Sequence, residues 1–94
     1  MKVIMPASVT AAIKTLGSEE SRKVLSWFDH LKNWENDEHT RDMAKPTIYH
    51  GVFVLNTTDD IRIFFNVDSE KQSITVLDIA KPSRFEVIRE KAEN

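Results

Sequence analysis

The sequence predicts an α+β fold in which an antiparallel sheet packs against a helical hairpin. Three observations support this prediction. Two stretches with helical periodicity adjoin each other in the first third of the chain, and three stretches rich in β-branched and aromatic residues follow, separated by hairpin-length turns. A proline-led helical stretch then ends the chain. We therefore expect two layers with the element order β-α-α-β-β-β-α.

The composition is that of a small globular protein. The chain has 94 residues, of which 40% are hydrophobic, so we expect residues 1–94 to form a single domain rather than a disordered segment. Cysteine is absent, which excludes disulfides and thiolate zinc sites and suits a reducing cytoplasm. We expect no metal or other cofactor.

The charge and the apolar runs bear on possible partners. The apolar start of the chain is too short for a signal peptide, and no apolar stretch approaches the ~18 residues of a membrane helix, so we expect no membrane association. The net charge of −2 argues against nucleic-acid binding through bulk charge. A net charge of −2 is still compatible with a local basic patch on the surface.

The first third of the chain predicts a short strand and two helices. Residues 2–5 form the expected strand, which stops at Pro6, and Ser8 or Thr10 would cap the first helix. Gly17 is expected to end that helix in the left-handed conformation, and Ser18 to cap the second one. The second helix shows a broad apolar stripe, which indicates core packing rather than base stacking: Val24, Trp27, Phe28, Leu31 and Trp34.

The second half predicts a three-stranded meander. Residues 35–47 are polar and aperiodic, so we expect a loop there, with Met43 as its core anchor. The strands are expected at residues 48–55, 61–67 and 73–80, because turn residues separate them. Residues 82–92 are expected to form a terminal helix, begun by Pro82, with Phe85 and Ile88 directed inward.

Side-chain alternation assigns faces to two of these strands. In the second strand, Ile61, Ile63, Phe65 and Val67 should face one way, and Arg62, Phe64 and Asn66 the other. In the third strand, Ile74 and Val76 should share one face, with Leu77 and Ile79 on the opposite one.

Three segments stand out beside the element order: residues 60–67 (DIRIFFNV), 73–81 (SITVLDIAK) and 83–88 (SRFEVI). Together with that order, they resemble the RelE/ParE toxin superfamily. The resemblance implies a toxin of a type II toxin–antitoxin system, neutralised by a cognate antitoxin protein. RelE-like members cut mRNA on the ribosome, whereas ParE-like members inhibit DNA gyrase. The resemblance leaves both targets open.

Three basic residues match basic positions of this family: Arg62, Lys81 and Arg84. Arg62 should emerge on the same face as Phe64, where a guanidinium could hold a phosphate bidentately. The alternative for Arg62 is a solvated side chain or a cross-strand ion pair with Asp78. For Lys81 and Arg84 the alternative is an ordinary charged helix surface.

Four positions depart from the family pattern. Val52 and Val54 stand where RelE-like enzymes carry catalytic lysines, Pro82 where an arginine is common, and Ile88 where a C-terminal tyrosine is usual. Valine transfers no proton and stabilises no phosphate charge. The resemblance therefore implies an incomplete RelE constellation, which keeps a ParE-like toxin or an inactive interaction module as alternatives.

Histidine is a natural acid–base group, and the chain contains three. His50, with Tyr49 beside it, is expected at the start of the 48–55 strand, on the same face as Val52 and Val54. An imidazole there could serve as an acid–base group, or it could be an edge histidine without a chemical role. His30 and His39 are expected to be exposed, and the spacing of the three histidines predicts no metal site.

Overall fold

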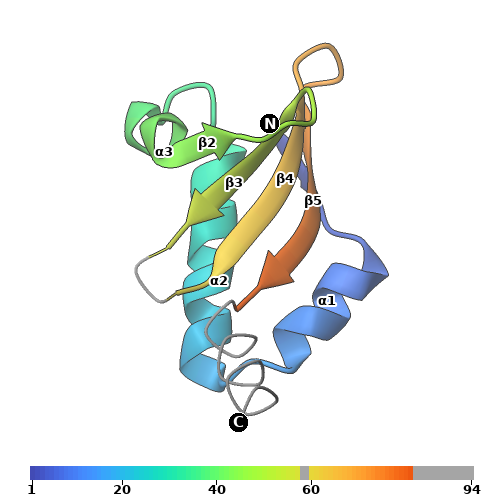
Figure 1. Ribbon diagram of the computed structural model, residues 1–94, viewed down its shortest axis with the longest axis vertical. Helices are drawn as coiled ribbons and strands as arrows, with labels where there is room; N and C mark the ends of the chain where they lie inside the picture. Colours follow the sequence, from blue (N-terminus) through green and yellow to red (C-terminus); the bar gives the residue numbers. More distant parts are fainter. Residues whose placement is uncertain (58–59, 82–94) are drawn as a thin grey trace, which may run out of the picture.

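The computed structural model describes residues 1–57 and 60–81. Within these residues the elements follow in the order β1 (Lys2–Ile4), α1 (Ala7–Lys14), α2 (Ser18–Lys32), α3 (Glu38–Met43), β2 (Ala44–Pro46), β3 (Val52–Asn56), β4 (Arg62–Asp68) and β5 (Ser73–Ala80) (Figure 1). The α+β class is confirmed. The expected helix at residues 82–92 lies outside the described residues.

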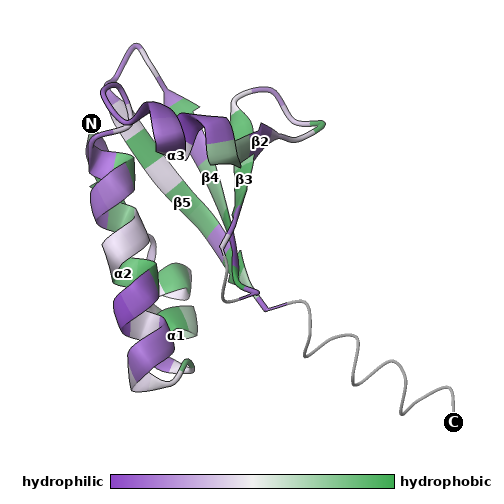
Figure 2. Ribbon diagram, turned by 90° about the vertical axis from the view of Figure 1, so that its left-hand side faces the viewer, coloured by the Kyte–Doolittle hydropathy of each residue, from purple (hydrophilic) through white to green (hydrophobic). Residues whose placement is uncertain are grey.

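The strands form one sheet in the order β1-β5-β4-β3-β2. The three expected strands pair as an antiparallel meander, β3 with β4 and β4 with β5. The first strand adds a feature that the sequence did not indicate, because β1 lies parallel to β5, with Ile4 opposite Thr75. Figure 1 and Figure 2 show α1 and α2 together on one side of the sheet. We call the opposite surface of the sheet the outer face.

The core lies between this helical pair and the inner face of the sheet. The apolar stripe of α2 is confirmed, because its central side chains are buried with those of α1 and the sheet; the main members are Val9, Ile13, Val24, Phe28, Leu31, Leu55, Ile63, Phe65, Ile74 and Val76. Trp34 lies beyond the end of α2 at Lys32 and packs against the core. Its ring centroid lies 5.5 Å from that of Phe65, in an edge-on arrangement.

Both predicted helix caps differ in the structure. Pro6 occupies the N-cap of α1 with φ −63°, and no side chain caps this helix, so neither Ser8 nor Thr10 has that role. Gly17 is the N-cap of α2, in extended backbone with φ −63° and ψ 159°, and Ser18 is already helical. No left-handed residue is needed there, because the amides of Thr15 and Leu16 close the last turn of α1 on carbonyls three residues back.

The predicted loop at residues 35–47 is wrong, because it contains α3 and β2. Asp37 caps α3, since its Oδ1 accepts a 3.0 Å hydrogen bond from the amide of Thr40. The Arg41 guanidinium donates a 2.7 Å hydrogen bond to the Trp34 carbonyl, which ties α3 to the end of α2. Met43 packs against the core, as expected. These contacts place β2 beside β3.

The predicted strand at residues 48–55 begins only at Val52. Residues 48–51 form a turn, in which the Thr47 hydroxyl accepts from the Tyr49 amide at 3.1 Å and donates to the Val52 carbonyl at 2.9 Å. Gly51 has φ 77°, a conformation that favours glycine. Ile48 is 93% exposed at this turn. The β-branched composition of the segment was therefore misleading.

The faces of β4 are as expected, but β5 contains a bulge. Ile61, Ile63 and Phe65 are buried, whereas Arg62 is exposed. Phe64 lies opposite Asp78 and Phe65 opposite Val76, which leaves Leu77 as the extra residue. The bulge resets the alternation, so Ile79 packs against the core while Leu77 is 44% exposed. The prediction that these two share a face is wrong.

Candidate functional site

The outer face carries a row of four side chains in register across four strands. Lys45 of β2 lies opposite Val54 of β3, Val54 opposite Phe64 of β4, and Phe64 opposite Asp78 of β5. Residues directly across neighbouring strands project from the same face. Arg62 lies two residues from Phe64 along β4 and therefore shares this face.

Arg62 has the position that the sequence predicts. It is exposed, and its cross-strand neighbours are Asn56 and Ala80. The expected alternative, an ion pair with Asp78, is not formed, and no other carboxylate among the described residues pairs with Arg62. Asp78 instead accepts a 2.8 Å hydrogen bond from the amide of Ile79. The role of Arg62 as a site residue stays a prediction.

Lys45 is a cation of the outer face that the sequence reasoning missed. It is exposed and forms no ion pair with the described residues. It was missed because the loop predicted at residues 35–47 gave its side chain no direction. The available signal was Asp37 ahead of Glu38, a typical N-cap followed by an acidic first turn. A helix begun there would end near Met43 and allow a strand to follow.

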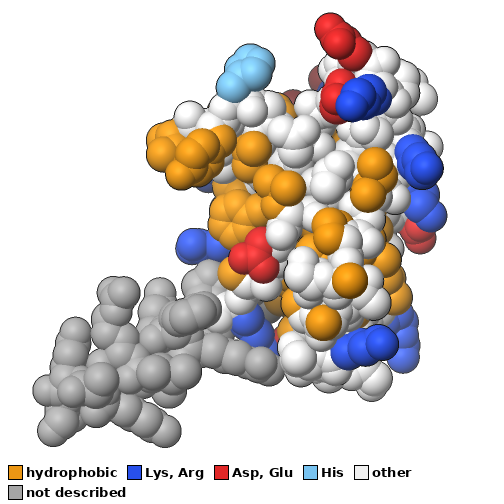
Figure 3. All heavy atoms as spheres, turned by 90° about the vertical axis from the view of Figure 1, so that its right-hand side faces the viewer, with side chains coloured by type: hydrophobic (Ala, Val, Ile, Leu, Met, Phe, Trp, Pro, Cys, Tyr) orange, Lys and Arg blue, Asp and Glu red, His pale blue; other side chains and the backbone are white. Residues whose placement is uncertain are grey.

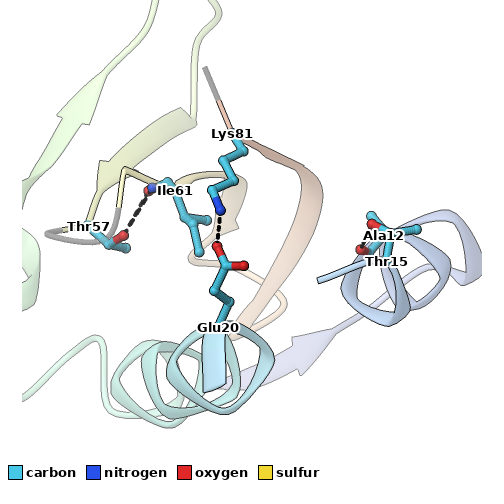
Figure 4. A network of polar contacts seen from close by, with 6 residues as sticks. All are labelled: Ala12, Thr15, Glu20, Thr57, Ile61 and Lys81. Atoms are coloured by element: carbon cyan, nitrogen blue, oxygen red, sulfur yellow. Dashed lines mark hydrogen bonds and ion pairs between the residues drawn. The ribbon is translucent and has the colours of Figure 1, made fainter. Parts of the chain in front are cut away.

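Lys81 lies on the other side of the sheet. It forms an ion pair with Glu20 in the first turn of α2 (Figure 4), and both side chains are about three-quarters buried. It also lines a cavity of about 290 Å³ with Leu16 and Ile61, between the sheet and the helices. The charge of Lys81 is thus directed at α2 and is not brought together with that of Arg62. Arg84 lies outside the described residues.

His50 and Tyr49 lie at the end of the sheet remote from Arg62. Both are exposed in the 48–51 turn, and both line a cavity of about 450 Å³ with Trp34 and other residues. Val52, which follows this turn, pairs with Asn66, four residues from Arg62, so the separation is about 13 Å along the strand. The prediction that His50 lies on a strand beside Val52 and Val54 is therefore wrong.

The corner near this turn is apolar. Ile48 and Tyr49 are 93% and 68% exposed. Figure 3 shows hydrophobic side chains and a histidine gathered at one corner of the molecule, apart from most of the Lys and Arg side chains. The predicted site residues that the structure describes are therefore divided among three places: the outer face, the 48–51 turn and the interface with α2.

The other two histidines are separate from these places. His30 Nδ1 lies 2.9 Å from Asp37 Oδ2, and His39 is exposed on α3. The Thr40 amide and the His30 ring, both bonded to Asp37, lower the pKa of that carboxyl to about 2. Within residues 1–57 and 60–81, no three His, Asp or Glu side chains cluster in a way that could hold a metal ion.

Hydropathy bears on membrane insertion as well. Within the part of the chain that the structure describes, no helix is both long and apolar enough to span a bilayer.

The outer face can therefore bind anions but shows few groups for proton transfer. Arg62 and Lys45 supply two cations, while Val52, Val54 and Phe64 supply apolar surface. A guanidinium and an ammonium can stabilise phosphate charge.

Comparisons with known proteins show which solved structures share this fold. No protein-family model and no curated protein matches the sequence. Among solved structures, the isolated RelE toxin of Escherichia coli has a TM-score of 0.71 at 16% identity, covering 98% of this chain and 95% of that one. The toxin–antitoxin complexes RelBE2 of Mycobacterium tuberculosis and RelBE of E. coli both have a TM-score of 0.69. Their identities are 16% and 14%, over 85% of this chain and 95% and 94% of theirs. The fold of this chain is the RelE fold.

Proposed function

We propose that this chain, which shares the fold of the RelE/ParE toxin superfamily, is the toxin of a type II toxin–antitoxin system. Three solved structures of this fold are described as a RelE toxin or as RelBE complexes. The observation that supports the proposal most directly is Arg62, an exposed cation without a carboxylate partner among the described residues, set beside Phe64. The proposed compartment is the cytoplasm.

The activity that we propose is a RelE-like, ribosome-dependent endonucleolytic cleavage of mRNA. Such a reaction needs removal of the 2′-hydroxyl proton, stabilisation of a charged phosphorane-like transition state and protonation of the leaving oxygen. Arg62 would supply the charge stabilisation. Arg84 stays a candidate for a second phosphate contact. His50 is a weaker acid–base candidate than the sequence indicates, because its turn lies at the far end of the sheet from Arg62.

A non-catalytic, ParE-like toxin that inhibits DNA gyrase is the second candidate. Two observations favour it. Val52 and Val54 project from the outer face with no group that could move a proton, and Lys81 is paired with Glu20. An inactive interaction module is the third reading. The outer face would then serve only to bind a macromolecule.

The proposed partner is a cognate antitoxin that covers the outer face. Phe64 is half-buried there, between Val54 and Asp78 in the neighbouring strands, and adjoins the exposed Arg62. An antitoxin segment that brings an apolar side chain to Phe64 and a carboxylate to Arg62 would suit this surface. The ribosome and mRNA, or gyrase, would compete for the same face.

Induced expression in a bacterium tests the proposal. Wild-type protein, Arg62→Gln and the matched control Arg22→Gln, which changes an exposed arginine on α2, are expressed while growth and mRNA 5′ ends are followed. We expect growth arrest and new 5′ ends with wild type and Arg22→Gln, and at least about tenfold fewer new ends with Arg62→Gln. Arrest with intact mRNA and loss of gyrase supercoiling would favour the second candidate. Unimpaired growth with wild-type protein would contradict a toxin.

A further inference from the structure

We propose that this chain pairs with a second copy of itself through the 48–51 turn, with Ile48 of each copy inserted into the cavity beside the turn of the other. The inference rests on an exposed apolar side chain and an apolar cavity that adjoin each other at the end of the sheet remote from Arg62. It does not depend on the proposed toxin function.

Ile48 is the most exposed of the large apolar side chains that the structure describes. It is 93% exposed, and the adjoining Tyr49 is 68% exposed. Figure 2 shows the segment that follows β2 projecting from the body of the molecule with a hydrophobic tip. A single exposed apolar residue is ordinary on a protein surface, but two adjacent ones on a projecting turn form a patch that burial would stabilise.

Hydrogen bonds fix the turn so that Ile48 points away from its own chain. The Thr47 hydroxyl donates a 2.9 Å hydrogen bond to the Val52 carbonyl, and the Gly51 carbonyl accepts one of 2.9 Å from the Val67 amide. Ile48 does not line the cavity that other residues of the turn help to form. Because the turn is already ordered, its side chains lose little conformational entropy when a partner covers them.

The cavity has the size and the lining to receive an aliphatic side chain. Its volume of about 450 Å³ is typical of pockets that hold small ligands. Trp34, Phe53 and Val67 contribute apolar walls, and the ring centroids of Trp34 and Phe53 lie 5.6 Å apart. Because Ile48 and the cavity adjoin each other on one copy, a two-fold axis between them makes both insertions at once. This is the geometry of an isologous dimer.

Charges beside the turn and beside the cavity are complementary under the same axis. Lys45 lies on β2, which leads into the turn, whereas Glu70 follows Ser69, which lines the cavity after β4. These two strands lie on opposite sides of β3. Lys45 and Glu70 are exposed, and neither forms an ion pair within the described part of the chain. The two-fold axis brings Lys45 of one copy towards Glu70 of the other, which favours a second copy over an unrelated apolar segment.

The area of contact determines how strong the dimer is. Each insertion buries roughly 250 Å² of Ile48 and Tyr49 and a similar area of the cavity, so the two insertions together bury about 1,000 Å². This is the lower limit for a specific interface. We therefore expect a weak dimer with a dissociation constant of about 10–100 μM.

Sedimentation velocity of the purified full chain, from micromolar to millimolar concentration, tests the dimer. We expect Ile48→Ser to weaken the association at least about tenfold, because both copies lose a buried side chain. Ser69→Trp, which fills the cavity from its rim, should have the same effect. Leu25→Ser changes an apolar residue on α2 that is 47% exposed, and this control should associate like the wild type. Circular dichroism and the urea midpoint establish that each variant is folded.

Cross-linking tests the reciprocal insertion itself. The chain has no cysteine, so Ile48→Cys and Ser69→Cys each carry a single thiol. The two variants, one of them labelled with ¹⁵N, are mixed and mildly oxidised, and mass spectrometry identifies the disulfides formed. We expect disulfides between positions 48 and 69 to predominate, because the insertion brings Ile48 of one copy to the cavity rim of the other. Ile48→Cys mixed with Ser18→Cys, which places the thiol at the start of α2, should form few mixed disulfides.

The outcomes separate this inference from the proposed function. A wild-type chain that stays monomeric throughout, an association that Ile48→Ser leaves unchanged, or equal cross-linking of position 48 to positions 69 and 18 would each overturn the inference. So would a surface that binds only a different protein. An association that both Ile48→Ser and Ser69→Trp weaken, together with selective cross-linking of positions 48 and 69, supports it. Neither result depends on whether the expressed protein arrests growth.

Discussion

Glu20 and Lys81, sixty-one residues apart in the sequence, form an ion pair that joins the first turn of α2 to the end of β5 (Figure 4). Their side chains are 26% and 25% exposed, so the pair is screened from solvent more than a surface pair would be. Glu20 also lies where the α2 dipole favours a negative charge. In this position Lys81 links the end of the sheet to the first turn of α2.

Removal of either charge should therefore destabilise the fold. We expect Glu20→Gln and Lys81→Gln each to lower the free energy of unfolding, and a double-mutant cycle to give a coupling of about 1 kcal/mol. Urea unfolding measures these values. Glu19→Gln, an exposed residue in the same helical turn, is the matched control and should change the midpoint little. A coupling indistinguishable from zero would show that the pair contributes no stability.

The cap of α3 predicts a pH dependence of stability. The hydrogen bonds from the Thr40 amide and the His30 ring lower the pKa of Asp37 from 3.8 to about 2. The unfolded chain therefore takes up this proton more readily than the folded one, so the carboxylate stabilises the fold above about pH 4, and its contribution is lost as the pH falls towards 2.

Asp37→Asn keeps a side chain that can cap a helix but removes the titration. We expect urea midpoints measured from neutral to acidic pH to fall less steeply below pH 4 for Asp37→Asn than for wild type. Asp42→Asn, an exposed change in the same helix, should follow the wild-type curve. Parallel curves for wild type and Asp37→Asn would contradict the assignment of the lowered pKa to this cap.

The elements that could be predicted from sequence are those in which a periodic pattern of apolar residues continues along the whole helix or strand. The α2 stripe repeats over several turns, and β4 alternates through Ile61, Ile63 and Phe65, so burial on one face follows directly from spacing. The exposure of Arg62 follows from the same alternation. That Arg62 has no carboxylate partner among the described residues does not follow from it, because Asp78 lies on the same face, opposite Phe64, and still forms no ion pair with Arg62.

The features that could not be predicted depend on contacts distant in sequence. The three-residue β2 exists because β3 pairs with it and because Arg41 holds α3 against the Trp34 carbonyl. Lys45 consequently reaches the outer face without a periodic signal of its own. For His50 the sequence predicts a strand where the structure has a turn. The neighbouring residues are typical of strands, but Thr47 stabilises the turn through hydrogen bonds between its hydroxyl and the backbone.

The bulge at Leu77 gives a prediction that separates the two readings of β5. Leu77 is 44% exposed, whereas Ile79 packs against the core. We expect Leu77→Ser to change the free energy of unfolding by less than about 0.5 kcal/mol, and Ile79→Ser to lower it by about 2 kcal/mol. Thermal or urea unfolding of the two variants measures the difference. Equal losses would indicate regular alternation with both side chains on one face.

The two glycines of the chain make a matched pair for testing backbone conformation. Gly51 has φ 77° in the turn that carries Tyr49 and His50, and an added Cβ would lie 3.3 Å from Asn66 Nδ2. Gly17 has φ −63°, and the nearest atom to an added Cβ is Glu20 Oε1 at 3.6 Å. We expect Gly51→Ala to lower the free energy of unfolding by about 1–2 kcal/mol and Gly17→Ala to change it by less than about 0.5 kcal/mol.

Urea unfolding of both glycine variants gives these values. The sequence alone favours the opposite order, because it assigns the left-handed conformation to Gly17 at the end of the first helix. A larger loss for Gly17→Ala would therefore restore that interpretation and contradict the extended N-cap of α2. A loss confined to Gly51→Ala would instead show that the 48–51 turn is held in one conformation, by a glycine whose carbonyl also accepts a 2.9 Å hydrogen bond from the Val67 amide.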